Sequence, residues 1–141
     1  MPGSKKFEKS TRIRFAHCDP AGIVFFPQYL VLFNGLVEDW FTDALGVSYA
    51  DFFNSRRIGL PIVRLECDFR AISRQGDEIT LALEPQRLGR SSLTLDFECR
   101  AQDQPRVTSR QVLVFTDLDS HRSIEMPPDV RQSLSHFISN S

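Results

Sequence analysis

The sequence has no excess of charge of either sign. Its 141 residues carry 17 lysines and arginines against 18 aspartates and glutamates, a formal net charge of −1. Nucleic-acid-binding domains usually carry a marked basic excess, so this balance argues against nucleic acid as a partner. The composition, 41% hydrophobic and 25% charged, is typical of a soluble globular protein. At this length we expect a single domain over residues 1–141.

Cysteines and long apolar runs are also scarce. The three cysteines, Cys18, Cys67 and Cys99, are an odd number without close spacing, which favours neither a disulfide framework nor a zinc site. Free thiols are typical of a reducing compartment. The N-terminal residues MPGSKKFEKS lack the apolar core of a signal peptide, and no run approaches the ~18 apolar residues of a membrane span. We therefore expect a cytoplasmic protein without membrane association, with residues 1–9 flexible.

What the sequence does contain is one long helical pattern. Pro27 suits the first helical position, where its missing N–H needs no partner, and Gly46 fits a C-cap. Between them apolar residues recur at spacings of three and four, which predicts a helix that is mostly enveloped by other elements. These residues are Tyr29, Leu30, Phe33, Leu36, Val37, Trp40, Phe41, Ala44 and Leu45. Shorter helical pieces are expected at residues 47–53 and after Pro127-Pro128.

Five segments alternate apolar and polar residues, as half-buried strands do. They are residues 11–16, 62–71, 79–87, 93–101 and 107–116. The last four follow one another through short turns, including one at residues 73–77, and short connections favour antiparallel neighbours. Only the long helix is large enough to cover the apolar face of such a sheet. The pattern predicts an α+β protein, a curved antiparallel sheet of about five strands wrapped around one central helix.

The predicted sheet also needs protection at its edges. Residues 112–115 are apolar on both faces, and long exposed edges invite pairing with another chain. Pairing through a sheet edge or a helix face in a dimer would meet this need.

A carboxylate lies just before the long helix, in the turn His17–Gly22. Asp19 stands in Asp-Pro-Ala-Gly, for which two interpretations are open. In one, Asp19 only accepts backbone N–H groups in a turn or at a helix start. In the other, it is a nucleophile or general base, helped by donors that stabilise developing negative charge. The amides before Pro27, above all that of Phe26, are such donors, because the helix macrodipole favours an anion there.

Nearby residues are weaker candidates. His17 and Cys18 are not expected to form a Cys–His pair, because adjacent residues in an extended segment point to opposite faces. We interpret His17 as a turn residue or a contact to the edge of a substrate. Asn34 either faces a pocket or starts the polar stripe of the helix, and Arg90 is a turn charge that matters if a phosphorylated ligand crosses there. No pattern indicates a metal or a redox cofactor.

Three segments carry a resemblance to a known family. They are FAHCDPAGIVFFPQYL at residues 15–30, GLPIVRLECDF at residues 59–69 and LGRSSL at residues 88–93. Together they resemble the 4-hydroxybenzoyl-CoA thioesterase family, whose members are hotdog-fold acyl-CoA thioesterases, from about Thr11 to Asp129. The resemblance implies a sheet wrapped around a central helix. It also implies homodimers with sites at the subunit interface, usually paired into homotetramers.

The resemblance also implies roles for individual residues. Asp19 matches the catalytic carboxylate of the family, and Phe26 matches the residue whose backbone N–H polarises the thioester carbonyl. Asn34 falls where an acidic residue lies near the acyl group of the 4-hydroxybenzoyl enzyme. Arg90 matches one member of a basic cluster that meets the CoA phosphates.

The chain departs from that pattern at three places. His17 stands where the 4-hydroxybenzoyl enzyme has an acidic residue, Asn34 replaces Asp, and the basic cluster is reduced to Arg90. These departures leave the acyl group open. The sequence predicts hydrolysis of an aromatic or short- to medium-chain acyl-CoA to CoA and a carboxylic acid, without a cofactor. The alternatives are an enoyl-thioester hydratase of the same fold and a non-catalytic acyl-thioester-binding protein.

Overall fold

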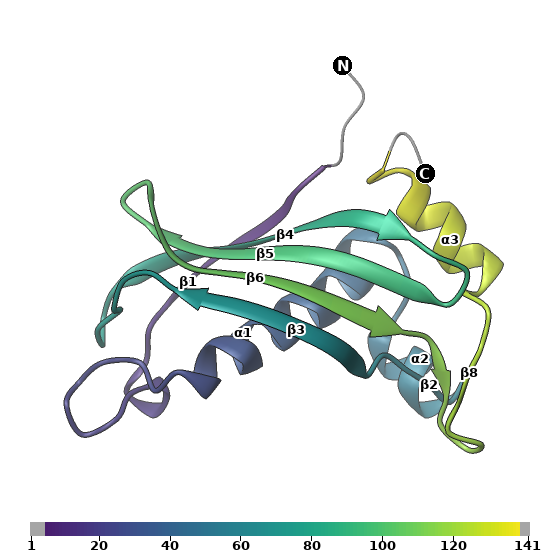
Figure 1. The fold of residues 1–141 in the computed structure, drawn as a ribbon, viewed down its shortest axis with the longest axis horizontal. Coiled ribbons are helices and arrows are strands. Elements are labelled where there is room, and N and C mark those ends of the chain that lie inside the picture. Colours follow the sequence, from purple (N-terminus) through teal and green to yellow (C-terminus); the bar gives the residue numbers. More distant parts are fainter. Residues whose placement is uncertain (1–4, 139–141) are drawn as a thin grey trace.

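A five-stranded antiparallel sheet forms one layer of the protein, and a long helix packs against one of its faces (Figure 1). The computed structural model describes residues 5–138. The strands lie in the order β1-β4-β5-β6-β3, and every neighbouring pair is antiparallel. The predicted α+β class, with about five strands around one helix, is confirmed. The bounds are Phe7–Arg12 for β1, Ile62–Phe69 for β3, Glu78–Leu88 for β4, Ser92–Ala101 for β5 and Gln104–Val114 for β6.

The long helix begins where the sequence predicts. α1 spans Pro27–Asp39 and continues directly into a π-helical turn, Trp40–Ala44. In that turn the Leu45 N–H donates to the Trp40 carbonyl at 2.9 Å, one residue further back than in an α-helix. Gly46 then ends the helix with a φ of +72°, which glycine adopts without strain.

The core lies between α1 and the sheet. Phe33 and Trp40 are fully buried on the inner face of the helix. The Phe33 ring contacts the ring of Phe97 on the central strand β5, with centroids 4.9 Å apart. Because burying such a side chain contributes about 1.5–3 kcal/mol, these contacts fix the helix across the sheet. The N-terminus of α1 is thereby placed at one end of the sheet.

The connection between β3 and β4 differs from the prediction. Turn residues at 73–77 favour a hairpin between adjacent strands, but β3 pairs with β6 at one edge whereas β4 lies between β1 and β5. Residues 70–77 therefore cross the end of the sheet over three strand spacings, about 14 Å. Local turn residues do not determine strand pairing, which depends on contacts between segments distant in the sequence.

The first strand lies earlier than predicted. β1 pairs with β4 from Phe7, opposite Leu83, to Arg12, opposite Glu78. Residues 15–17 form a short 3₁₀ turn instead of a strand, and Phe15 is 79% exposed. The expectation of a flexible segment at residues 1–9 is wrong for residues 7–9, which pair in the sheet. Residues 1–4 lie outside the described part of the chain.

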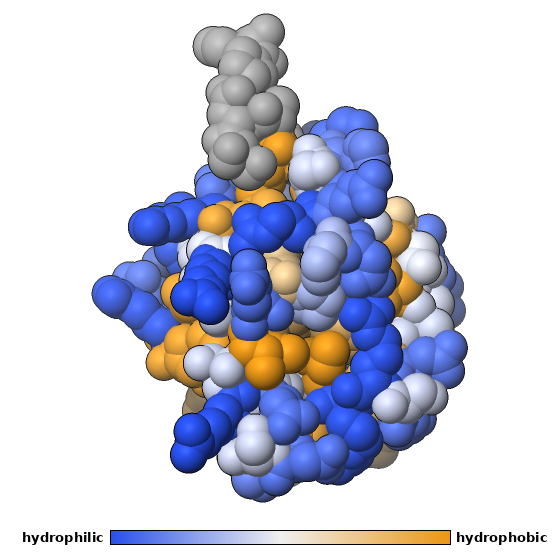
Figure 2. Space-filling view, turned by 90° about the vertical axis from the view of Figure 1, so that its right-hand side faces the viewer, coloured by the Kyte–Doolittle hydropathy of each residue, from blue (hydrophilic) through white to orange (hydrophobic). Residues whose placement is uncertain are grey.

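Short elements cluster at the end of the sheet opposite the start of α1. The two short helices are α2 (Tyr49–Asn54) and α3 (Pro128–Ser135), close to where the sequence predicts them. β2 (Ile58–Gly59), β7 (Thr116–Asp117) and β8 (Arg122–Ser123) form a small three-stranded sheet that the sequence did not indicate. Figure 2 shows this end as hydrophilic around an apolar patch. Among the described residues, no helix is long and apolar enough to cross a membrane.

The exposed apolar edge of the sheet is β3. Residues 112–115, singled out as apolar on both faces, lie at the end of β6, which is flanked by β5 and β3 and is not an edge. β3 instead exposes Val63, Leu65 and Phe69 by 61%, 41% and 50%. The need for edge protection therefore remains, at a strand other than the one the sequence indicated.

Candidate active site

A β-hairpin holds the turn that precedes α1. Cys18 pairs with Val24 across the hairpin, and the Asp19 N–H donates to the Ile23 carbonyl at 2.9 Å. The Gly22 N–H donates back to the Asp19 carbonyl at 2.9 Å, and Gly22 takes a φ of +81° that suits glycine. Asp-Pro-Ala-Gly therefore forms the tip of a hairpin whose second arm leads into α1 (Figure 1).

The Asp19 carboxylate is half-buried and makes one hydrogen bond. Its Oδ1 accepts the Ala21 N–H at 2.8 Å, which is the geometry of an Asx turn. Its Oδ2 has no hydrogen-bond partner in the part of the chain that the structure describes. One oxygen therefore shapes the turn while the other stays available to a ligand.

The backbone N–H of Phe26 is unpaired. Phe26 is the N-cap of α1, and Pro27 has no N–H. The next two amides are satisfied locally: Gln28 donates to the Phe25 carbonyl at 2.8 Å and Tyr29 to the Phe26 carbonyl at 3.1 Å. No acceptor for the Phe26 N–H is found among residues 5–138. A free amide at a helix start carries part of the positive end of the macrodipole and suits an oxyanion.

A cavity of about 300 Å³ opens beside the hairpin. Asp19 lines it together with Phe25 and Gln28, so the carboxylate and the helix start border the same space. In the sequence Gln28 is one of the polar residues between the apolar positions of the helix, where a polar residue indicates only solvent exposure. Its half-buried side-chain amide has no hydrogen-bond partner within residues 5–138 and is free for a ligand. The lining is completed by Ala16, Cys18 and Pro20.

A larger hollow, of about 430 Å³, lies over the sheet and contains none of the predicted site residues. Charged side chains such as Glu66, Asp96 and Arg110 line it. Arg110 donates to both Asp96 carboxylate oxygens, at 2.7 and 2.9 Å. Of the two, only the smaller cavity is lined by the carboxylate of Asp19 and by a residue of the first turn of α1, Gln28.

The side chains of His17 and Cys18 both form hydrogen bonds with the backbone of Arg14. The His17 Nδ1 accepts the Arg14 N–H at 2.9 Å, and the Cys18 thiol donates to the Arg14 carbonyl at 3.6 Å. Among the described residues, no hydrogen bond joins the two side chains. His17 serves as a turn residue, and its Nε2 remains for the substrate contact that was also predicted.

The structure does not bring Asn34 and Arg90 to this cavity. Asn34 is exposed about two helical turns beyond Phe26, roughly 12 Å along the axis. Arg90 is in the β4–β5 turn with its side chain 83% exposed and 4.0 Å from Glu125. Because β4 runs from the site end to this turn, Arg90 lies about 30 Å from the hairpin.

The remaining cysteines do not supply a reactive thiolate. Burial raises the pKa of Cys99 to about 12, and burial also raises the pKa of Cys67. A thiol is a nucleophile only when ionised, so neither acts at neutral pH. In the described part of the chain, no group of three or more His, Cys, Asp and Glu side chains could hold a metal ion.

Comparisons with known proteins place this geometry in context. The sequence matches the model of the thioesterase-like superfamily over residues 13–134. A 1,4-dihydroxy-2-naphthoyl-CoA hydrolase of Synechococcus elongatus is 29% identical over 116 residues, which cover 82% of this chain and 85% of the relative. A solved gentisyl-coenzyme A thioesterase superposes with a TM-score of 0.81 at 23% identity, covering 91% of this chain and 99% of the other. A Staphylococcus aureus protein solved in complex with CoA reaches 0.86 at 15% identity, covering 98% and 87%.

These likenesses confirm the predicted hotdog fold. The matched region contains both the Asp19 hairpin and α1. The match is to the wider superfamily, whereas the sequence motifs resemble the 4-hydroxybenzoyl-CoA thioesterase family in particular, and the curated relative is named for a different aromatic acyl group. The chain therefore belongs to the thioesterase-like superfamily, and the predicted enzyme class, an acyl-CoA thioesterase, is confirmed.

Proposed function

We propose that the protein hydrolyses an aromatic acyl-CoA, using Asp19 as nucleophile or general base and the Phe26 amide as oxyanion donor. One observation carries this proposal: a carboxylate oxygen and a helix-start amide, both without a partner among the described residues, belong to one short hairpin-to-helix segment, residues 19–26. The relatives named for naphthoyl-CoA and gentisyl-CoA support an aromatic acyl group. A 4-hydroxybenzoyl group stays among the candidates.

Two routes fit this arrangement. In the first, Asp19 attacks the thioester carbon, the carbonyl oxygen becomes an oxyanion held by the Phe26 N–H, and the C–S bond breaks to release CoA thiolate. Water then hydrolyses the mixed anhydride and restores the carboxylate. In the second, Asp19 takes a proton from water, the resulting hydroxide adds to the carbon, and the proton passes to the departing thiolate.

Oxygen-18 tests the covalent route. After a single turnover in labelled water, label in the Asp19 carboxylate indicates an anhydride that water opened on the enzyme side. Label confined to the product acid excludes that step, and it fits both the general-base route and an anhydride opened at the acyl carbon. Both outcomes are read by mass spectrometry of the digested protein and of the acid.

The substrate contacts that we propose extend beyond the Asp19 cavity. His17 would contact the substrate edge through its free Nε2, and Asn34 would meet the acyl group. Arg90 would meet the CoA phosphates. Because Arg90 lies about 30 Å from the hairpin of its own chain, we propose that a second copy supplies it.

The exposed apolar strand β3 is the edge at which we place that second copy. Val63, Leu65 and Phe69 are each exposed by 41% or more, whereas Glu8, Lys9 and Ser10 make the opposite edge, β1, polar. Antiparallel pairing of two β3 strands would join the sheets and cover these side chains. We propose a homodimer on this basis, with a homotetramer as the further step.

A thiol-release assay over a panel of aryl-, short- and medium-chain acyl-CoAs and carrier-protein thioesters tests the function. We expect release of CoA, fastest with aryl substrates. Water addition to an enoyl-thioester that stays intact would instead indicate a hydratase. Ligand binding without thiol release would indicate a non-catalytic acyl-thioester-binding protein.

A further inference from the structure

The hairpin that carries Asp19 is fastened to the loop of residues 70–77, not to a strand of the main sheet. Val24 donates its N–H to the Ser73 carbonyl at 3.0 Å, and a β-bridge joins Ile23 to Arg74. The position of the hairpin therefore depends on whatever holds this loop in place.

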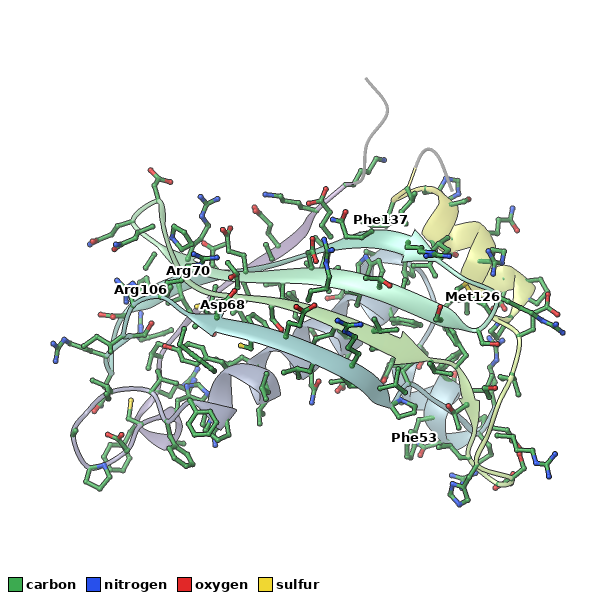
Figure 3. All side chains as sticks on the ribbon, viewed as in Figure 1. Phe53, Asp68, Arg70, Arg106, Met126 and Phe137 are labelled. Atoms are coloured by element: carbon green, nitrogen blue, oxygen red, sulfur yellow. The ribbon has the colours of Figure 1, made fainter. Side chains whose placement is uncertain are left out.

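Arg106, on β6, holds the loop through one guanidinium nitrogen. Its Nη1 donates to the Ile72 carbonyl at 3.0 Å, to the Ser73 Oγ at 3.2 Å and to the Asp77 Oδ2 at 3.0 Å. The same Asp77 oxygen accepts the Arg74 N–H at 2.9 Å, which closes the loop on itself. The Arg106 side chain is only 14% exposed, so salt and water screen the pair less than a surface ion pair. Figure 3 shows Arg106 at the end of the sheet where the hairpin lies.

Ser73 extends this network to the start of α1. It is fully buried, and it lies close enough to the Tyr29 hydroxyl to counteract in part the rise that burial gives the pKa of Tyr29. Tyr29 lies in the first turn of α1, next to the free Phe26 amide. Burial raises the pKa of Tyr29, so its hydroxyl keeps its proton at neutral pH. Ser73 thus contacts the hairpin through its carbonyl and lies close to Tyr29 at the helix start.

We propose that Arg106 is a positioning residue that sets the Asp19 carboxylate relative to the Phe26 amide, an inference that rests on the thioesterase function proposed above. Arg106 touches neither substrate nor reacting atoms and acts through Ser73 and Asp77. A displacement of about 1 Å can cost ~100-fold in rate, so a loosened loop lowers kcat more than it changes KM. Lysine replaces a guanidinium only in part, because an ammonium is a point charge without a planar fork of donors.

Arg110 supplies a matched control. It lies on the same strand and also forms an ion pair, with two bonds to Asp96. Those bonds are exposed on the outer face of the sheet, and no bond from the Arg110 side chain to residues 70–77 occurs in the described chain. Arg106→Gln and Arg110→Gln therefore remove the same charge from the same strand, but only the first removes side-chain hydrogen bonds to residues 70–77. The backbone hydrogen bonds from residues 70, 71 and 76 to Arg106 and Ile13 remain in both variants, so the first loosens the loop without detaching it.

The experiment measures thiol release from an aryl-acyl-CoA by the wild type, Arg106→Gln, Arg106→Lys and Arg110→Gln, with urea unfolding of each. We expect Arg106→Gln to lower kcat by about 10- to 100-fold with KM nearly unchanged. Arg106→Lys should recover part of the loss, and Arg110→Gln should keep the wild-type kcat. Hydrogen exchange of the Val24 amide should accelerate in Arg106→Gln and not in Arg110→Gln.

Equal kcat in the two glutamine variants overturns the proposal. If Arg106→Gln does not fold, Asp77→Ala tests the same network, because it removes the carboxylate that accepts from Arg106 Nη1 and from the Arg74 N–H. Wild-type kcat together with unchanged exchange of the Val24 amide in Asp77→Ala then overturns the proposal. A wild-type protein that releases no thiol refutes the thioesterase function itself, so the two failures are distinguishable.

Discussion

Replacing Asp19 separates its role in the turn from its role in chemistry. The two candidate roles use different oxygens: Oδ1 accepts the Ala21 N–H at 2.8 Å, whereas Oδ2 is free within the described residues. Asp19→Asn keeps an oxygen that can accept the Ala21 N–H but has no carboxylate to attack a carbonyl or to take a proton. Asp19→Ala loses both functions. If both roles are real, the two variants therefore lose activity alike, whereas Asp19→Ala loses more stability than Asp19→Asn.

The magnitudes follow from the bonds involved. A single hydrogen bond contributes about 0.5–1.5 kcal/mol to the free energy of unfolding, so Asp19→Ala should lose about 1 kcal/mol and Asp19→Asn less. Loss of an essential nucleophile or base lowers kcat by ~100-fold or more, which corresponds to about 2.7 kcal/mol in the activation free energy. Both variants should therefore lose turnover to a similar extent, although only Asp19→Ala loses stability.

Thiol release measures kcat, and urea titration measures the free energy of unfolding of each variant. A folded Asp19→Asn protein with near wild-type turnover would remove Asp19 from the mechanism. It would leave Asp19 as the Asx-turn residue that was the simpler interpretation of Asp-Pro-Ala-Gly. Activity that falls only in Asp19→Ala, in step with stability, would refute the reasoning in the same way.

Three other substitutions test separate parts of the site. Phe26→Pro removes the proposed oxyanion donor, and the φ of −53° at this position is one that proline adopts. We expect kcat to fall by ~100-fold relative to Phe26→Ala, which keeps the N–H. Equal kcat values in the two variants would exclude this amide as the donor. Leu65→Lys, on the edge strand β3, should lower the mass measured by sedimentation toward that of a monomer, whereas the control Gln86→Lys, on β4, should not. An unchanged mass in Leu65→Lys would argue against β3 as the dimer interface. Hydrogen bonds from the Arg74 N–H and from Arg106 lower the pKa of Asp77. The ionised carboxylate therefore stabilises the folded protein at neutral pH, and this contribution is lost as the pH falls from ~4, the ordinary pKa of an aspartate, through the lowered pKa. Urea titrations should show Asp77→Asn about 1 kcal/mol less stable at pH 7 and the difference gone in acid, whereas a constant difference would refute this.

The sequence predicts the elements better than their arrangement. α1 was identified from Pro27 to Leu45 because apolar spacing, a proline start and a glycine end agree locally. Its π-helical turn at Trp40–Ala44 leaves no such signal. The β3–β4 connection was predicted wrongly because Gly76 and its neighbours indicate a bend in the chain but not which strands lie next to each other.

The same holds for the candidate site: the sequence indicates residues that are close together in the chain and misses those that are far apart. Asp19 and Phe26 are neighbours in one hairpin-to-helix segment, so a single local motif reveals both. Arg106 acts on that segment from a strand far away in the sequence, and it resembles the other arginines of an alternating strand. Asn34 and Arg90 were assigned by resemblance alone, and the described chain places neither at the cavity. The contact that we propose for Arg90 depends on a second copy, which one sequence does not position.

Two aspartates at the same end of the sheet show how the structure separates a reactive carboxylate from a structural one. In the sequence both stand in turns that contain glycine, Asp19 three residues before Gly22 and Asp77 directly after Gly76. In the structure Asp77 is bound by the Arg106 guanidinium and by a backbone N–H, which fixes it and lowers its pKa. Asp19 accepts one amide and leaves an oxygen free. Both bonds of Asp77 fall on its Oδ2, so each aspartate keeps one oxygen without a partner in the described chain, and what separates them is the cationic partner that binds Asp77 alone. We therefore propose that Asp19 carries the chemistry and that Asp77 supports the hairpin.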